Sequence, residues 1–217
     1  MQDKYLSVIT NFGCHYSCPY CIVKNNHLNI PRTTIEGLSR LREEILENNV
    51  NWVSISGGGD PLWKYEDHKR WWKCFFEQIP VAVNLELHTS ILEIDEDLKK
   101  QFDRIVYHLH DFEQLKHIKR SEGGEIVRAV FVVTEDFTEE LINRIAEYRE
   151  RSPEIDEMSF RQMVDNHYES TNYCAEHLRM GHKKKWWYIE QCDYNLYYCE
   201  NELYTEYRKI GENRKDL

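Results

Sequence analysis

The chain has 217 residues, enough for one domain with a substantial core, and its formal net charge is −10. Such an acidic balance gives no overall attraction for a nucleic-acid polymer, which the sequence does not favour as a substrate. No apolar run approaches the length of a membrane-spanning helix, and the first residues lack the basic-then-apolar pattern of a signal peptide. Seven cysteines without an export signal indicate a reducing compartment, so we expect a cytoplasmic protein.

Strand-like and helical stretches alternate along most of the chain. Strands are predicted at residues 5–10, 52–56, 81–89, 105–110, 126–134 and 155–163. Helices are predicted from the capping box at 33–36, over 63–78 and 112–118, and from Asp136 or Thr138 to Tyr148. Six β-α units in series imply parallel strands joined by right-handed crossovers.

These units predict an α/β fold, an open partial (β/α)6 barrel of the TIM type. A closed eight-unit barrel usually needs about 250 residues, and this chain completes its sixth unit near residue 163. We expect residues 1–163 to form the barrel and residues 164–217 to form an extension packed on it within the same domain. Aromatic strand-like runs at 186–191, 194–199 and 203–208 predict a terminal β-hairpin or meander.

Alternate positions of the predicted strands carry polar side chains. They are Ser54, Ser56, Asn84, Glu86, His88, Ser90, His108, His110, Arg128, Ser159 and Arg161. The other faces of these strands are apolar and suit packing beneath helices. Because a barrel core is ordinarily filled with branched apolar residues, a polar interior predicts a polar ligand bound in the cavity.

Three cysteines near the N-terminus, Cys14, Cys18 and Cys21, follow the first strand in the spacing C-x₃-C-x₂-C. They supply three thiolates to one metal centre, whereas a closed structural zinc site takes four ligands. A centre held by three cysteines leaves one position open, which is a mark of catalysis. The alternative is a zinc site completed by His15 or by a distant residue.

A second motif, Ser56-Gly57-Gly58-Gly59-Asp60-Pro61, follows the second strand. With the cysteine loop, it resembles the radical S-adenosylmethionine (radical SAM) superfamily over roughly residues 4 to 163. The resemblance implies a [4Fe-4S] cluster on the three cysteines, with S-adenosylmethionine (SAM) chelating the open iron through its methionyl amine and carboxylate. Reductive cleavage of SAM would then give a 5′-deoxyadenosyl radical that abstracts hydrogen from a substrate.

The resemblance also implies roles for single residues. Tyr20 takes the aromatic position expected beside the adenine, and the glycine turn brings backbone groups close to the methionyl amine. The family's usual motif is Gly-Gly-Glu-Pro, whereas this chain has an extra glycine and a shorter acid. The cofactor-binding candidates are Tyr20, Gly57, Gly58, Gly59, Asp60, His88, Ser90 and Arg128, the last as a bidentate partner for the methionyl carboxylate.

Three further side chains are substrate candidates: His108, His110 and Arg161. The histidines could equally be structural, and Arg161 could hold a substrate carboxylate or phosphate, or pair with Glu86. Cys174, Cys192 and Cys199 could ligate an auxiliary cluster, but their spacing is long and contains no C-x₂-C pair, so we do not expect one.

We therefore expect an oxygen-sensitive radical SAM enzyme acting on a small polar substrate, such as a nucleoside, a modified base or an amino-acid derivative. The expected partner is a one-electron reductant such as flavodoxin or ferredoxin. The alternatives are an activase that installs a glycyl radical on a partner protein, and a non-catalytic iron–sulfur or zinc protein. The sequence leaves open the substrate, the oligomeric state, and whether SAM is consumed or regenerated.

Overall fold

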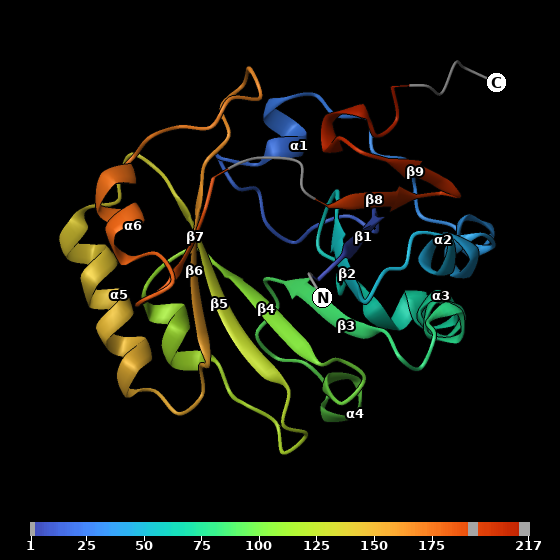
Figure 1. The fold of residues 1–217 in the computed structure, drawn as a ribbon, viewed down its shortest axis with the longest axis horizontal. Coiled ribbons are helices and arrows are strands. Elements are labelled where there is room, and N and C mark those ends of the chain that lie inside the picture. The colour runs from blue at the N-terminus through green and yellow to red at the C-terminus, as the bar shows by residue number, and fades with distance from the viewer. Residues whose placement is uncertain (1–2, 191–194, 213–217) are drawn as a thin grey trace. The chain divides into compact units, whose positions relative to one another are not determined.

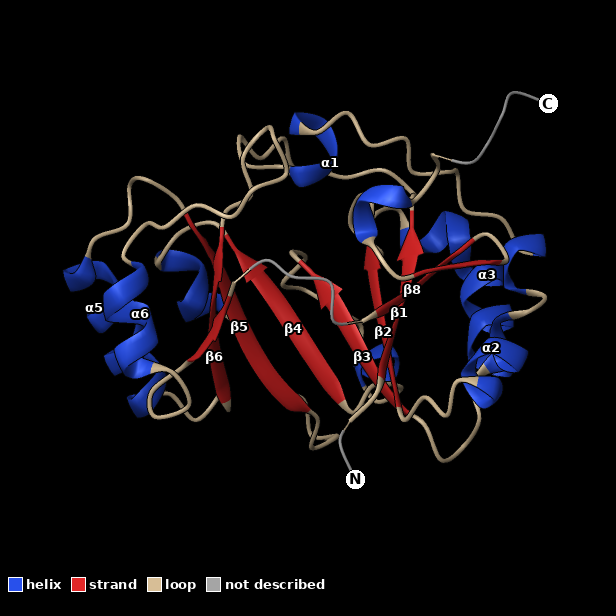
Figure 2. Ribbon diagram, turned by 45° about the horizontal axis from the view of Figure 1, so that its top comes forward, coloured by secondary structure: helices blue, strands red, loops and turns tan. Residues whose placement is uncertain are grey.

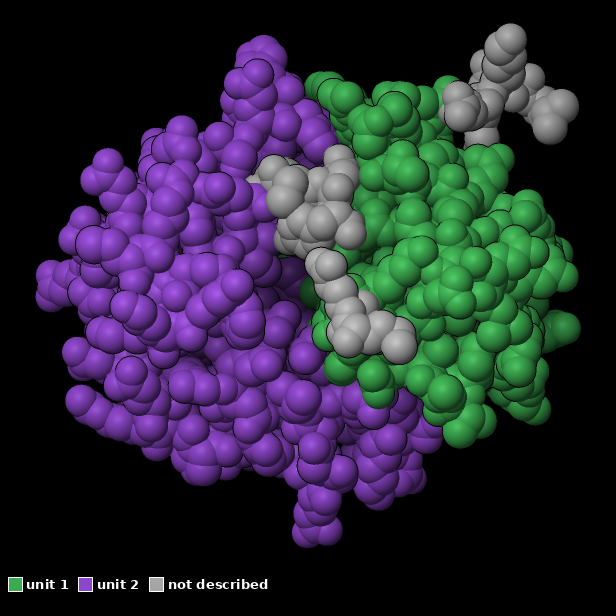
Figure 3. All heavy atoms as spheres, in the orientation of Figure 1, with its two compact units in different colours: residues 1–18, 27–89, 193–217 green, residues 19–26, 90–192 purple. Residues whose placement is uncertain are grey.

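The computed structural model describes residues 3–190 and 195–212, and within them the chain divides into two compact units. Unit 1 contains residues 1–18, 27–89 and 193–217, and unit 2 contains residues 19–26 and 90–192; Figure 3 colours them separately. Both are α/β units whose strands are mostly parallel, so the predicted fold class is confirmed. Closure into a partial barrel stays a prediction.

Unit 1 has five strands in the order β3-β2-β1-β8-β9. Its elements are β1 (Tyr5–Thr10), η1 (Glu36–Leu38), α2 (Leu41–Glu47), β2 (Trp52–Gly57), α3 (Tyr65–Gln78), β3 (Asn84–Thr89), β8 (Leu196–Cys199), β9 (Glu202–Tyr204) and η3 (Tyr207–Lys209), where η marks a 3-10 helix. Strands β1, β2, β3 and β8 pair in parallel, and β9 runs antiparallel to β8. Figure 2 shows α2 and α3 beside these strands.

Unit 2 has four strands in the order β7-β6-β5-β4, all paired in parallel. Its elements are α1 (Ile22–Asn25), α4 (Glu96–Lys99), β4 (Arg104–Leu109), η2 (Glu113–His117), β5 (Ile126–Val133), α5 (Glu139–Arg151), β6 (Glu157–Gln162), α6 (Ala175–Gly181) and β7 (Trp187–Ile189). Of the two predicted caps for α5, Thr138 is the one used, because its side chain accepts a hydrogen bond from the amide of Leu141.

The alternation of apolar and polar residues sorts the two faces of the strands as predicted. The predicted apolar positions of β2 to β5 are buried: Val53, Ile55, Leu85, Leu87, Ile105, Tyr107, Leu109, Ala129, Phe131 and Val133. In unit 1, Trp71, Trp72 and Phe75 of α3 are also buried, and their rings contact one another. Apolar burial of this kind is the main favourable contribution to folding.

The helix predicted from the capping box is broken in two. Thr34 does cap a first turn, since its hydroxyl accepts from the amide of Gly37. The helix is interrupted at Ser39 and Arg40, between η1 and α2, where Asn201 of the β8–β9 turn accepts hydrogen bonds from the Arg40 amide and the Ser39 hydroxyl. This tertiary contact gives the Arg40 amide a hydrogen-bond acceptor that a continuous helix would have provided from its own backbone.

The terminal hairpin is confirmed for β8 and β9, but β7 is not part of it. Strand β7 pairs with β6 in unit 2, whereas β8 pairs with β1 in unit 1. Glu200 and Asn201 turn the hairpin with positive φ values of 49° and 66°, and the Glu200 carboxylate accepts from the amide and the hydroxyl of Thr34. The C-terminal segment thus completes the edge of the unit 1 sheet.

Replacing Asn201 tests this connection. The Asn201 side chain accepts from Ser39, Arg40 and Tyr198 and donates to the carbonyl of Glu36. We expect Asn201→Ala to lower the free energy of unfolding by about 1–3 kcal/mol, measured by urea denaturation. Asn201→Gly removes the same bonds but tolerates the positive φ. Wild-type stability of Asn201→Gly would show that the side-chain bonds contribute little.

Candidate functional site

The loop that carries the first two cysteines is hydrogen-bonded to the glycine turn. Strands β1 and β2 pair in register, so that Thr10 lies opposite Gly57. Beyond this pair, the amide of Gly58 donates to the carbonyl of Thr10 at 2.7 Å, and the amide of Asp60 donates to the carbonyl of Gly13 at 3.0 Å. The two motifs singled out in the sequence therefore form one backbone structure at the carboxyl ends of adjacent parallel strands.

This close approach explains why the turn is built from glycine. A Cβ atom at Gly59 would lie 2.0 Å from the carbonyl oxygen of Gly13, and one at Gly57 would lie 2.5 Å from the carbonyl oxygen of Gly59. Both neighbours are backbone atoms that cannot rotate away. A side chain at Gly59 would push the backbone of Gly13 away from the turn, and one at Gly57 would distort the turn itself.

Asp60 follows the turn as a buried carboxylate, only 4% exposed. Its Oδ1 atom accepts from the amide of Leu62 at 2.9 Å and from the hydroxyl of Thr89 at 2.8 Å. These bonds connect the turn after β2 to the last residue of β3. Asp60, the shorter acid of this motif, therefore stabilises the turn. The sequence did not indicate this structural role.

The three motif cysteines are free thiols, exposed at Cys14 and partly buried at Cys18 and Cys21. Cys14 and Cys18 belong to unit 1 and Cys21 to unit 2, where it precedes helix α1. Among residues 3–190 and 195–212, no three His, Cys, Asp or Glu side chains are grouped so that they could hold a metal ion. The chemistry of the donors fits an iron–sulfur centre, since three thiols outside any disulfide lie on one loop with at least partial access to solvent.

Tyr20 and His110 contact each other within unit 2. The Tyr20 hydroxyl and the Nδ1 atom of His110 are 2.5 Å apart, and the two rings are nearly parallel with their centroids 5.9 Å apart. The amide of His110 also donates to the side chain of Gln114. A predicted cofactor residue and a predicted substrate residue are thus brought together by one hydrogen bond.

His88 and Ser90 lie at the end of β3. The Nε2 atom of His88 is 2.7 Å from Oε1 of Glu86, which is itself buried, so this pair orients the imidazole along the strand. Ser90 directly follows the strand and is partly buried. Both positions agree with the predicted carboxyl-end location, and their cofactor contacts stay a prediction.

Arg128 lies near the beginning of β5, away from the carboxyl end. It pairs in register with Glu157, the first residue of β6, and its guanidinium forms an ion pair with that carboxylate at 2.5 Å. Arg104 adds a longer contact to the same carboxylate at 3.5 Å. Since its charge is compensated here, we leave Arg128 out of the candidate site.

His108 and Arg161 lie nearer the carboxyl ends of β4 and β6. The register places His108 beside Val130, and Val130 beside Ser159; Arg161 lies two residues further along β6, beside Val132. The side chains of His108 and Arg161 are partly buried, and both residues lie in unit 2. The substrate candidates His108, His110 and Arg161 therefore share one face of one sheet.

The remaining cysteines do not form a second ligand group among the described residues. Cys174 precedes α6 and donates through its thiol to the carbonyl of Phe137 at 3.3 Å, while burial and nearby Glu139 raise its pKa. Cys199 is buried at the end of β8 in the other unit. Cys192 lies outside the described residues, so the absence of an auxiliary cluster stays a prediction.

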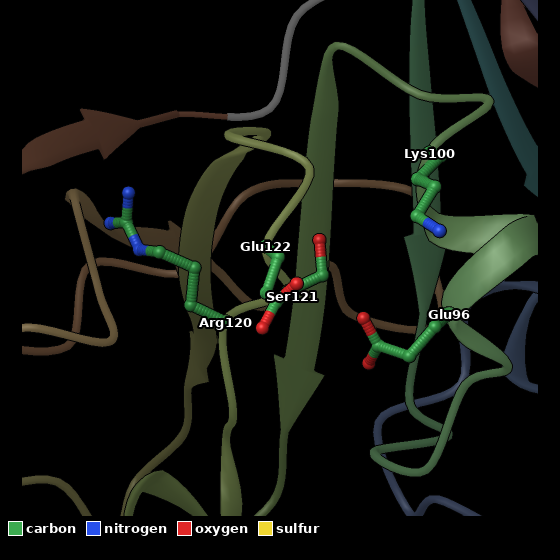
Figure 4. Close-up of a pocket in the computed structure, with 5 residues that line it drawn as sticks. All are labelled: Glu96, Lys100, Arg120, Ser121 and Glu122. Carbon is green, nitrogen blue, oxygen red and sulfur yellow. The ribbon is translucent and has the colours of Figure 1, made fainter.

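A cavity of about 300 Å³ lies elsewhere in unit 2 and contains none of the predicted site residues. It is lined by Glu96, Lys100, Arg120, Ser121 and Glu122, and Figure 4 shows the Arg120 guanidinium pointing away from the others. Lys100 pairs with Asp97, and Arg120 pairs with Asp156. Because its lining contains neither motif and none of the predicted side chains, we do not take this cavity as the candidate site.

Sequence reasoning missed Tyr207, which belongs to the C-terminal segment. Its hydroxyl donates to the carbonyl of Gly57 at 3.3 Å, and its ring contacts Tyr197 of β8 edge to face. Just after it, a Cβ atom at Gly211 would lie 2.0 Å from the carbonyl oxygen of Asn29. No local pattern distinguishes Tyr207 from the other tyrosines of this segment, because the contact spans 150 residues.

Comparison with known proteins finds similarity in fold but not in sequence. No family model matches the sequence, and no curated protein matches it by sequence. The fold is similar to that of Streptococcus suis SuiB, solved in a crystal structure bound to the precursor peptide SuiA, with a TM-score of 0.68 and 14% identity. The match covers 99% of this chain and 62% of the SuiB chain.

Asp60→Ala tests the part that Asp60 plays in the turn. The substitution leaves the buried hydroxyl of Thr89 without this acceptor, so we expect the free energy of unfolding to fall by about 1–3 kcal/mol in urea denaturation. Thr89→Val removes the hydroxyl instead. In the double variant the two losses should be less than additive, and strict additivity would show that the two side chains do not interact.

Proposed function

We propose that this chain is a radical SAM enzyme that carries a [4Fe-4S] cluster on Cys14, Cys18 and Cys21. The observation that carries the proposal is the joining of the two motifs, in which the glycine turn is hydrogen-bonded to the backbone at Thr10 and Gly13. The loop that carries the cluster ligands would then lie beside the glycine turn, whose backbone groups are not covered by side chains. Both lie at the ends of neighbouring strands.

Bound to the cluster, SAM would supply a 5′-deoxyadenosyl radical for hydrogen abstraction. The chain's own residues would bind and orient the cofactor: the glycine turn through its backbone, Tyr20 beside the adenine, and His88 and Ser90 at the end of β3.

The polar face in unit 2 supports a small polar substrate. His108, His110 and Arg161 would contact it, with Tyr20 connected to His110 by a hydrogen bond. A second candidate is an amino-acid residue within a peptide, because the SuiB structure is bound to a precursor peptide. A one-electron reductant would be needed in either case.

The helices of the described residues include none with the length and apolar character that crossing a membrane requires.

Anaerobic reconstitution with iron and sulfide, followed by SAM and dithionite, tests the proposal. We expect about four irons per chain and formation of 5′-deoxyadenosine by the wild-type protein. Cys18→Ala should lose both, because a ligand is removed. Cys74→Ala is the matched control: Cys74 is a free, partly buried cysteine on α3, outside the motif. It should keep both properties, and a zinc-loaded wild-type protein that forms no product would refute the proposal.

Tyr207→Phe tests the hydrogen bond from the Tyr207 hydroxyl to the glycine turn, a contact that the sequence did not predict. A carbonyl oxygen can accept two hydrogen bonds, so the Tyr207 hydroxyl can hold the Gly57 carbonyl and leave it able to accept from a ligand ammonium. We expect this variant, once reconstituted, to bind SAM about 2- to 10-fold more weakly in equilibrium dialysis.

The control for this prediction is Tyr204→Phe. The Tyr204 hydroxyl donates to Glu202 within β9 and not to the turn, so its loss should leave SAM affinity unchanged. Equal affinities for SAM in the two variants would contradict a role of Tyr207 in positioning the turn. Iron content should be the same in both, since neither residue is a proposed ligand of the cluster.

A further inference from the structure

The polar face of unit 2 has a region near the carboxyl ends of its strands that is less covered than the opposite face. Val132 of β5, Arg161 of β6 and Ile189 of β7 lie side by side in the register, and all three are only partly buried. The residues that alternate with them, Phe131 and Phe160, are almost fully buried. A ligand can therefore reach this row of side chains.

Arg161 differs from the other arginines on these strands. Arg104 and Arg128 share the Glu157 carboxylate, which compensates their charge. Arg161 makes no hydrogen bond and no ion pair with any described residue, and its Nε atom is buried without a partner. A partly buried guanidinium without a counter-charge loses hydration that nothing in the described chain replaces.

Other groups around Arg161 suit a polar ligand. Ser159, two residues earlier on the same face, has a fully buried hydroxyl without a hydrogen-bond partner among the described residues. His108 is in the same register row as Ser159, and His110 follows it toward the carboxyl end, where it bonds to Tyr20. Val132 and Ile189 are the neighbours of Arg161 in the register, and apolar neighbours of this kind strengthen the attraction of a cation for an anion.

We propose that Arg161 binds an oxyanion of the substrate, a carboxylate or a phosphate. The inference rests on the proposed function and narrows its substrate class from polar to anionic. The planar guanidinium offers two parallel N–H donors that match either group. The overall charge of −10 does not attract an anion, so recognition depends on this one local cation and its hydrogen bonds.

Thermal unfolding of the full-length protein in sodium acetate, in sodium phosphate and in sodium chloride of equal ionic strength tests the site. At about five times its dissociation constant, a bound anion should raise the melting temperature of the wild-type protein by about 2–4 °C over chloride. Arg161→Gln should lose this increase. Arg179→Gln is the matched control, since Arg179 is an exposed arginine paired with Glu190 in the same unit, and it should keep the increase.

The result in each anion identifies the group that Arg161 binds. A higher melting temperature in acetate indicates a carboxylate, and a higher melting temperature in phosphate indicates a phosphate. Equal behaviour of the wild-type, Arg161→Gln and Arg179→Gln proteins would overturn the inference. Should Arg161→Gln fail to fold, Arg161→Lys keeps the charge but not the two parallel donors, and a full wild-type increase in that variant would also overturn it.

A separate measurement distinguishes the substrate from the cofactor. SAM binding to reconstituted protein is measured by equilibrium dialysis, and Arg161→Gln should leave the affinity within about twofold of wild type. A tenfold loss would assign Arg161 to the methionyl carboxylate and overturn the inference. A wild-type protein that binds no SAM would refute the proposed function, whereas the anion measurement does not depend on SAM.

Discussion

The pairing of β1 with β2 and its extension beyond the strand ends is the interaction on which the candidate site depends. The ladder ends with Thr10 opposite Gly57, and two further backbone hydrogen bonds connect the loop after β1 to the turn after β2. Backbone bonds of this kind need a close approach, and the glycines allow it because they have no Cβ. Asp60 then joins the same turn to the end of β3 through Thr89.

The C-terminal segment acts on this arrangement from the other side of β1. Strand β8 pairs with β1, the β8–β9 turn holds the segment from Thr34 to Arg40, and Tyr207 reaches the carbonyl of Gly57. Residues after 163 therefore contribute to the site and do not merely cover an edge.

Charge on the polar face of unit 2 is distributed unevenly along the strands. Near the amino ends, Glu157 compensates Arg104 and Arg128, and both guanidinium groups contact this one carboxylate. Near the carboxyl ends, Arg161 has no such partner among the described residues, and His110 is held by Tyr20. The same residue type is thus structural at one end of the sheet and available for a ligand at the other.

The sequence by itself determined the local features. Period-two alternation located the strands and the side chains on each face, and glycine and cysteine spacing located the two motifs, because these depend on neighbours a few residues away. The break between η1 and α2, the pairing of β7 with β6, the partner of Arg128 and the contact from Tyr207 to Gly57 came from the tertiary structure. Each depends on residues far apart along the chain, and only folding determines which of several chemically suitable partners a side chain meets.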